Sequence, residues 1–192
     1  MAKILSKYFL AIVPTGEVQE KVTALKLELK ETFNLKYALR SPAHITLKMP
    51  FQWNEAKEER LTTKLASFFQ SQPEFSLKLR GIGKFGRRVI FIQVREQPLL
   101  RELQGGLVEM CKTKLNLKKE LSDEAYHPHM TLAFKDMKER LFESYWDFLR
   151  GFDLSYSMEV KEVALLKKNG VKWEVSKKFL LGKNQKDFKN NI

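Results

Sequence analysis

Two histidines in this chain open the same short pattern. His44 begins the sequence His-Ile-Thr-Leu, and His129 begins His-Met-Thr-Leu about half a chain length later. Residues i and i+2 of a β-strand point to the same side, so each histidine is expected to share a face with Thr46 or Thr131. Two imidazole–hydroxyl pairs that face each other could bracket one small oxyanion from both sides.

A double site of this kind suits the cleavage of a phosphodiester. One imidazole would take a proton from the attacking water, and the other would protonate the departing oxygen. The two threonine hydroxyls would donate hydrogen bonds to the non-bridging oxygens as charge develops there. Imidazole serves either role near neutral pH, and the chemistry requires no metal or other cofactor.

The third histidine, His127, forms a His-x-His pattern with His129. Together with His44 it could build a three-histidine zinc site. That alternative gives the threonines no role, and no carboxylate ligand stands at an obvious spacing. We therefore expect no metal, and we expect His127 to neighbour His129 at the start of its strand.

The doubled His-x-Thr-Leu motif resembles the two-histidine (2H) phosphoesterase superfamily, in particular the RNA 2′,3′-cyclic phosphodiesterases, historically called 2′-5′ RNA ligases. The resemblance implies an α+β fold with two pseudo-symmetric lobes, each a mainly antiparallel sheet with outer helices, around a central cleft. It implies that His44, Thr46, His129 and Thr131 line this cleft and open a 2′,3′-cyclic phosphate. His44 would be the acid and His129 the base.

The neighbours of the two motifs suggest substrate contacts. RNA-processing members of the family often carry arginine two positions after the second leucine, where this chain has Phe134 followed by Lys135. We expect Lys48, Tyr126, His127, Phe134 and Lys135 to contact the substrate, with core packing as the alternative for the aromatic residues. The substrate could be an RNA end or a small cyclic-phosphate nucleotide.

Two other functions stay open at this point. The same residues could join RNA ends through a 2′-5′ bond, because the reaction is reversible. Alternatively, the chain could be a nucleic-acid-binding relative without catalysis. The net charge of +12 agrees with an anionic partner in every case.

Composition narrows the class of protein further. The chain has 192 residues with 43% hydrophobic content, enough to bury a core, and its single cysteine, Cys111, excludes an internal disulfide. No apolar run is long enough to span a membrane, and the apolar stretch near the N-terminus is too short for a signal peptide. We expect a cytoplasmic monomer without an obligate protein partner.

Hydrophobic periodicity supplies the elements that must position the motifs. It predicts strands at residues 7–13, 44–49, 75–85, 89–94, 127–134, 154–160, 163–167 and 173–180, and helices at 15–33, 54–70, from 98 onward, and 137–150. This order predicts a single bilobal α+β domain over residues 1–182, with a basic, disordered tail at 183–192.

Overall fold

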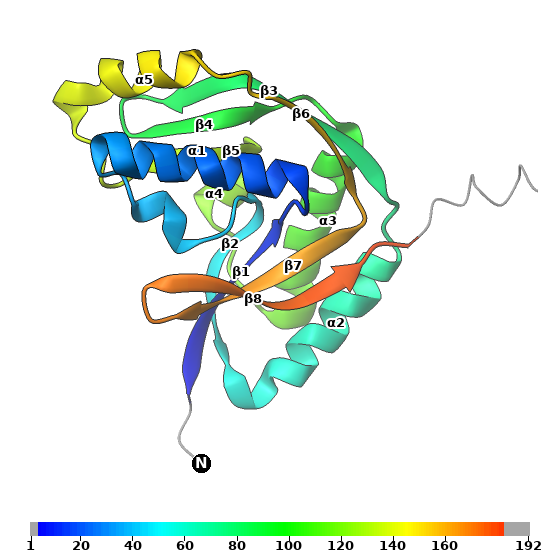
Figure 1. The fold of residues 1–192 in the computed structure, drawn as a ribbon. Coiled ribbons are helices and arrows are strands. Elements are labelled where there is room, and N and C mark those ends of the chain that lie inside the picture. Colours follow the sequence, from blue (N-terminus) through cyan, green and yellow to red (C-terminus); the bar gives the residue numbers. More distant parts are fainter. Residues whose placement is uncertain (1–3, 183–192) are drawn as a thin grey trace, which may run out of the picture.

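The computed structural model describes residues 4–182, and its centre is one curved sheet of eight strands (Figure 1). The strands are β1 (Leu5–Ile12), β2 (Ile45–Asn54), β3 (Phe75–Phe85), β4 (Val89–Val94), β5 (His129–Phe134), β6 (Ser155–Val160), β7 (Glu162–Asn169) and β8 (Lys172–Leu180). The α-helices are α1 (Glu17–Phe33), α2 (Glu58–Gln70), α3 (Pro98–Leu115), α4 (Leu121–Glu124) and α5 (Phe142–Arg150). Three short 3-10 helices are η1 (Tyr37–Arg40), η2 (Glu55–Lys57) and η3 (Glu139–Leu141).

The observed order of long elements confirms the sequence prediction of an α+β fold with an antiparallel sheet. Two differences matter for the site. The chain forms η1 just before the first motif and α4 just before the second, where no helix was predicted. The two expected lobes are also joined as the halves of one continuous sheet, because their central strands pair with each other.

The strand order places the motif-bearing strands at the middle of the sheet. The order is β6-β3-β4-β5-β2-β1-β7-β8, and every pairing between these strands is antiparallel. Strands β5 and β2 are therefore the central pair, and each has three further strands on its outer side. Their pairing brings the two motifs side by side at the middle of the sheet.

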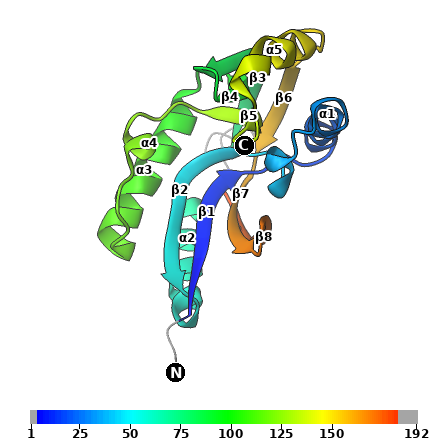
Figure 2. The ribbon, with the colours of Figure 1, turned by 90° about the vertical axis from the view of Figure 1, so that its left-hand side faces the viewer.

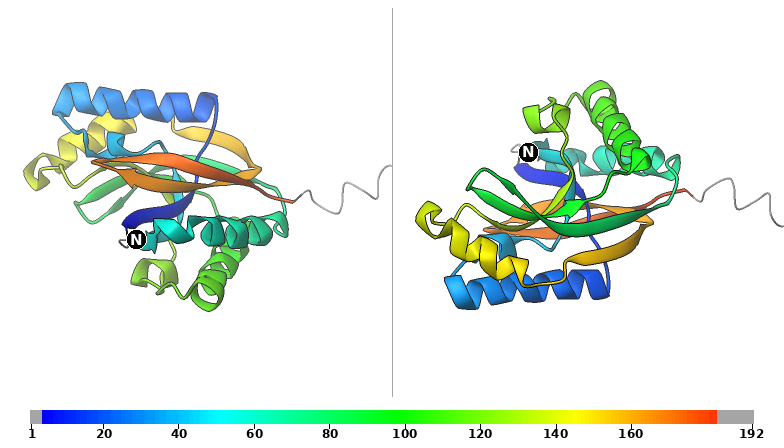
Figure 3. Two further views of the ribbon diagram at one scale, coloured as in Figure 1. Left: turned by 90° about the horizontal axis from the view of Figure 1, so that it is seen from below. Right: turned by 90° about the horizontal axis from the view of Figure 1, so that it is seen from above.

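The long helices cover the two halves in pairs. Helices α2 and α3 pack against each other and against β8 and β2, while α1 contacts β5 and α5 contacts β3. Figure 1 shows α1 and α5 together at one end of the molecule and α2 and α3 at the other, and the views in Figures 2 and 3 show the same separation. Each half of the sheet thus has one face covered by helices.

Alternation along the central strands separates a helix-covered core from the opposite face. Ile12, Ile45, Met130 and Ile92 lie side by side across four strands and belong to the main core. The residues that alternate with these four along each strand point to the other face. A smaller apolar cluster around Phe9 lies on that face, separate from the main core. The histidine and threonine positions of both motifs fall on this second face.

Two sequence-based predictions concern the tail of the chain and the absence of a membrane-spanning segment. The predicted disordered tail at 183–192 lies outside the described residues. Within residues 4–182, no helix is both long enough and apolar enough to cross a membrane.

Candidate active site

The pairing of the two central strands relates the two motifs by local symmetry. Ile45 on β2 lies opposite Met130 on β5 in an antiparallel register. When this register is continued by one residue in each direction, His44 lies opposite Thr131 and Thr46 lies opposite His129. Residues directly opposite have Cβ atoms about 5 Å apart, and diagonal neighbours such as the two histidines about 7–8 Å. The four side chains therefore form one compact group on one face.

Each motif histidine is oriented by the same backbone contact. Nδ1 of His44 lies 2.8 Å from the carbonyl oxygen of Pro42, and Nδ1 of His129 lies 2.7 Å from the carbonyl oxygen of His127. A carbonyl oxygen only accepts, so Nδ1–H must donate in both rings. Nε2 is then the nitrogen left for proton transfer in both cases. In both motifs the ring is held by the carbonyl oxygen of the residue two positions earlier, so the internal repeat of the sequence also appears in the hydrogen bonds.

Burial keeps both imidazoles neutral in the free protein. It lowers the pKa of His44 to about 4, although the hydrogen bond to the Pro42 carbonyl acts in the opposite direction. The positive charge of Lys26 lowers the pKa of His44 further. Burial likewise lowers the pKa of His129 below its usual value. A neutral ring has a lone pair on Nε2 and can accept a proton there. An anion bound in the site would favour the protonated form of the ring.

An aromatic wall supports the His129 ring. The rings of Phe85 and Phe91 each lie 5.0 Å from the His129 ring, between centroids. Phe91 can occupy this place because Gly83 lies beside it on β3, where an added Cβ would come within 2.3 Å of the Phe91 ring. In the other half of the sheet, Phe9 lies 5.0 Å from the His44 ring.

A β-bulge changes the expected role of Lys48. Ala11 pairs with Thr46 but Leu10 pairs with Lys48, so Leu47 is the extra residue and strict alternation fails there. The Lys48 side chain therefore lies on the helix-covered side and is only 1% exposed. The expectation that Lys48 contacts substrate is thus corrected.

The Lys48 ammonium is instead part of a buried ion pair. Its Nζ lies 2.5 Å from Oδ2 of Asp123 on α4 and donates to the Lys118 carbonyl oxygen at 3.1 Å. The Asp123 carboxylate also accepts from the backbone N–H groups of Met49 and Glu120. This network ties α4 to β2, next to the catalytic face.

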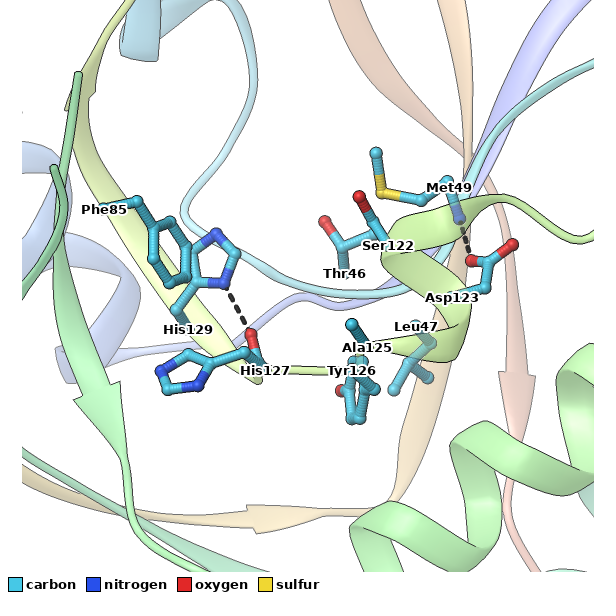
Figure 4. Close-up of a pocket in the computed structure, with 10 residues that line it drawn as sticks. All are labelled: Thr46, Leu47, Met49, Phe85, Ser122, Asp123, Ala125, Tyr126, His127 and His129. Atoms are coloured by element: carbon cyan, nitrogen blue, oxygen red, sulfur yellow. Dashed lines mark hydrogen bonds between the residues drawn. The ribbon is translucent and has the colours of Figure 1, made fainter.

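A pocket opens beside the Thr46–His129 side of the group, where β2 separates from the chain leading into β5 (Figure 4). Figure 4 shows His127, His129 and Phe85 on one side of this pocket and Thr46, Ser122 and Met49 on the other. Its lining residues are Thr46, Leu47, Met49, Phe85, Ser122, Asp123, Ala125, Tyr126, His127 and His129. His44 and Thr131, the next opposed positions along the same two strands, are not among these lining residues.

Two of the expected substrate contacts, Tyr126 and His127, line this pocket. The Tyr126 hydroxyl is buried without a hydrogen-bond partner among residues 4–182, and burial raises its pKa. His127 is exposed, with its ring 5.2 Å from that of Phe85. Phe85 was not expected at the site. Its sequence signal is weak, because it only ends a predicted strand just before a turn.

The other two expected contacts, Phe134 and Lys135, lie on the far side of the catalytic group. A second bulge in β5, where Phe91 pairs with Thr131 and Ile90 with Ala133, turns Phe134 to the same face as Thr131. The Phe134 ring lies 4.9 Å from the ring of Tyr37 on η1. Lys135 follows with a φ of 62° and donates from Nζ to the Tyr37 hydroxyl at 3.1 Å.

The metal-ligating side chains show no grouping that resembles a metal site. Among residues 4–182, no three or more histidine, cysteine, aspartate or glutamate side chains lie close enough together to hold an ion. His127 and His129 are near each other, with ring centroids 6.5 Å apart, but both rings pack against phenylalanines. The structure therefore offers the site two histidine–threonine pairs and an aromatic surround.

Comparison with known proteins gives a consistent family match. A model of the 2′-5′ RNA ligase superfamily matches residues 14–172. A phosphoesterase of Bacillus cytotoxicus is 30% identical over 183 residues, which is 94% of this chain and 99% of that protein. The RNA 2′,3′-cyclic phosphodiesterase of Geobacillus stearothermophilus is 28% identical over 170 residues, covering 85% of this chain and 52% of its own length.

Solved structures show the same architecture. E. coli LigT complexed with 3′-AMP superposes with a TM-score of 0.67 at 20% identity, covering 93% of this chain and 99% of LigT. The protein TT0787 of Thermus thermophilus superposes with a TM-score of 0.65 at 18% identity, covering 93% of this chain and 100% of that protein. At these identities the likeness concerns the fold, and it agrees with the curved antiparallel sheet and outer helices described above.

Proposed function

Because this chain belongs to the 2′-5′ RNA ligase superfamily of 2H phosphoesterases, we propose that it is a metal-independent phosphodiesterase that opens a 2′,3′-cyclic phosphate by two-histidine acid–base catalysis. One observation carries the proposal. The Ile45–Met130 register brings two histidine–threonine pairs to one face, with both imidazoles anchored through Nδ1.

The proposed reaction uses one proton transfer at each imidazole. Nε2 of the base accepts a proton from water as the water oxygen bonds to phosphorus. The bond between phosphorus and O3′ breaks, and Nε2–H of the acid gives its proton to O3′, which leaves a 2′-phosphomonoester. The hydroxyls of Thr46 and Thr131 donate to the non-bridging oxygens as their charge increases. Each proton transfer can contribute about 10²- to 10⁴-fold to the rate.

The resemblance assigns the acid role to His44 and the base role to His129. The base assignment agrees with burial, which keeps His129 neutral. The acid role requires a protonated His44, although its pKa is about 4 in the free protein. A bound phosphodiester brings one negative charge between the rings, and this charge stabilises the protonated form. Protonation of His44 is thus coupled to substrate binding.

The pocket beside His129 is suited to the nucleoside that carries the cyclic phosphate. Its wall combines Phe85 and His127, whose rings offer a stacking surface for a base. The unpartnered Tyr126 hydroxyl provides a hydrogen-bonding group within the same lining. A 2′,3′-cyclic phosphate held between Thr46 and His129 would place its nucleoside in this pocket.

The direct test is turnover of a panel of nucleoside 2′,3′-cyclic phosphates, ADP-ribose cyclic phosphate and cyclic-phosphate-ended RNA, with and without EDTA. We expect 2′-phosphate products, insensitivity to EDTA, and a loss of at least a hundredfold in kcat for His44→Ala and for His129→Ala. His127→Gln, which removes a histidine outside the doubled motif, should cost less than tenfold. Full activity in either motif variant would refute the mechanism.

The same panel separates the alternative functions. Supplying RNA ends with a 2′,3′-cyclic phosphate and a free 5′-hydroxyl, and comparing joining with hydrolysis, tests the ligase alternative, in which the 5′-hydroxyl replaces water as the nucleophile. A non-catalytic relative would bind RNA with a steep salt dependence and open none of the cyclic phosphates.

A further inference from the structure

A buried lysine on α1 stands close to the first motif. Lys26 lies on the buried stripe of α1 and is only 3% exposed. We propose that Lys26 is a positioning residue for His44, and that its ammonium, which has no carboxylate partner among residues 4–182, gains a counter-ion when an anion binds between the two motif histidines. This inference rests on the proposed function and adds a residue that supports it.

Lys26 ties α1 to the segment that leads into the first motif. Its Nζ donates to the carbonyl oxygen of Ala38 in η1 at 3.2 Å. The chain continues from η1 to Pro42, whose carbonyl oxygen accepts from Nδ1 of His44. Because Ala38 precedes His44 by only six residues, a shift of η1 would move the Pro42 carbonyl and with it the imidazole. The lysine therefore acts on His44 through this segment.

The other half of the fold makes the same connection with a neutral side chain. Gln104 on α3 is 5% exposed, and its Nε2 donates to the carbonyl oxygen of Asp123 in α4 at 3.1 Å. Asp123 precedes His129 by six residues, as Ala38 precedes His44. Each donor stands directly after one buried leucine and three residues before another: Leu25 and Leu29 on α1, Leu103 and Leu107 on α3. A glutamine thus suffices for this hydrogen bond, so the bond alone does not account for a charged side chain on α1.

The charge of Lys26 destabilises the free protein. Within residues 4–182 its Nζ makes no ion pair, whereas Lys48, which is also buried, pairs with Asp123. Burial lowers the pKa of Lys26 to about 8, so the ammonium is still the main form at neutral pH. Keeping an unpaired ammonium out of water has a free-energy cost that a hydrogen-bonded glutamine avoids. Such a cost is typical of a residue that serves function rather than stability.

The charge of Lys26 reaches the catalytic group. Burial lowers the pKa of His44, and the positive charge of Lys26 lowers it further. Of the elements packed against α1, β5 carries His129, which also disfavours protonation of His44, and η1 carries Arg40, whose guanidinium lies 4.2 Å from the centre of the Tyr37 ring. None of these groups is negatively charged. A phosphodiester bound at the motif histidines supplies the negative charge, so its binding balances Lys26 and favours the protonated form of His44 in the same step.

The first test removes the charge of Lys26 and keeps its hydrogen bond. Lys26→Gln gives α1 the side chain that Gln104 provides on α3. The chain has three histidines, so the imidazole signals of an NMR titration can be assigned with His44→Gln and His127→Gln. We expect the midpoint of the His44 signal to rise by about one pH unit in Lys26→Gln, at a Tm no lower than that of the wild type. A lower Tm with an unchanged midpoint would assign Lys26 to stability alone and overturn the proposal.

The second test measures anion binding by the wild type, so it does not depend on the folding of a variant. Inorganic sulfate is the probe, because its charge stays constant between about pH 7 and pH 9, where both motif imidazoles are neutral. We expect its Kd to rise by up to about tenfold over this interval as Lys26 loses its proton. In Lys26→Gln the Kd should already be higher at pH 7 and should change little with pH. A wild-type Kd that does not depend on pH would overturn the counter-ion role.

Two matched controls separate the charge from the hydrogen bond. Lys64→Gln removes an exposed lysine of α2 and should change neither the His44 midpoint nor the sulfate Kd. Gln104→Met removes the hydrogen bond to α4 without changing a charge, and it should lower the Tm and leave the His44 midpoint in place. Equal shifts of the midpoint in Lys26→Gln and Lys64→Gln would contradict the proposal.

Neither measurement requires turnover, so the two proposals can fail separately. Opening of a cyclic phosphate by a protein whose His44 midpoint is the same with and without the Lys26 charge would overturn the role of Lys26 and leave the proposed function intact. The expected shift of the midpoint and of the sulfate Kd, without turnover of any cyclic phosphate, would refute the proposed function alone.

Discussion

The buried Lys48–Asp123 pair gives the sharpest test of how the structure assigns roles near the site. Lys48→Met removes the ammonium and leaves the Asp123 carboxylate buried, with backbone N–H donors from Met49 and Glu120. Breaking a buried pair by removing one partner costs about 3–5 kcal/mol. The two remaining donors favour the lower end, about 3 kcal/mol. For a chain of this size that loss corresponds to a fall in Tm of roughly 6–12 °C.

A double-mutant cycle measures the coupling between the two side chains. Asp123→Asn keeps an oxygen that can accept from the backbone but removes the buried negative charge. We therefore expect Lys48→Met/Asp123→Asn to be more stable than Lys48→Met alone in urea unfolding, with a coupling free energy of about 1–3 kcal/mol. Lys64→Met, at an exposed position on α2, provides the control and should change stability by less than about 0.5 kcal/mol.

The same variant distinguishes a structural from a substrate-binding lysine. If Lys48 is structural, Lys48→Met that remains folded at low temperature keeps its KM for a nucleoside 2′,3′-cyclic phosphate while its Tm falls. If Lys48 contacts the substrate phosphate, KM rises and the Tm stays near that of the wild type. The second result would refute both the bulge assignment and the energetic reasoning built on it.

Three further changes probe the catalytic face. Gly83→Ala places a Cβ within 2.3 Å of the Phe91 ring. Because the Phe91 ring that packs against His129 must then move, we expect the free energy of unfolding to fall by about 1–3 kcal/mol and kcat/KM to fall as well. An unchanged kcat/KM would show that this wall does not position the ring. His44 has a pKa near 4 in the folded protein and about 6.5 when unfolded, so stability present above pH 6.5 is lost as the pH falls toward 4, by at most about 3 kcal/mol. Urea unfolding of His44→Gln should lack this part of the pH dependence, and an identical pH profile would contradict the assigned burial. Thr46→Val and Thr131→Val should each lower kcat about a hundredfold with little change in KM, as expected for donors that act in the transition state; a rise in KM alone would assign them to ground-state binding.

The parts of the fold that follow from local periodicity were predictable. The motif strands, the long amphipathic helices and the repeat at His44 and His129 all produce regular patterns in the sequence. The bulges do not, because an extra residue in a strand is set by pairing with the neighbouring strand. The role of Lys48 was wrongly predicted for this reason, since its direction depends on the bulge at Leu47.

Other features of the site were missed because their signal lies only in the comparison of the two halves. The segment at Tyr37–Arg40 ends four residues before His44, and α4 ends five residues before His129, so a short helix precedes each motif. Neither segment is periodic enough to be recognised by itself. A comparison of the two halves over eight residues upstream of each histidine would have covered both segments.

A symmetric pair of imidazoles cannot by itself determine the direction of the reaction. Each ring is anchored through Nδ1 to a carbonyl two residues upstream, so either could serve as acid or base for a water or a 5′-hydroxyl nucleophile. The residues that differ between the two sides of the catalytic group must therefore decide which histidine acts as acid and which as base.

The differences lie at matching positions around the symmetric centre. The pocket with Ser122 and Ala125, which we propose accepts the nucleoside, lies on one side, and Arg40 and Lys135 lie against the Tyr37 ring on the other. A nucleoside bound in the pocket would fix the orientation of its cyclic phosphate, and that orientation would decide which imidazole meets the leaving oxygen. Under the proposed mechanism, we therefore expect the assignment of acid and base to depend on the flanking residues as much as on the histidines, and exchanging the flanking residues should alter it without any change in the motifs.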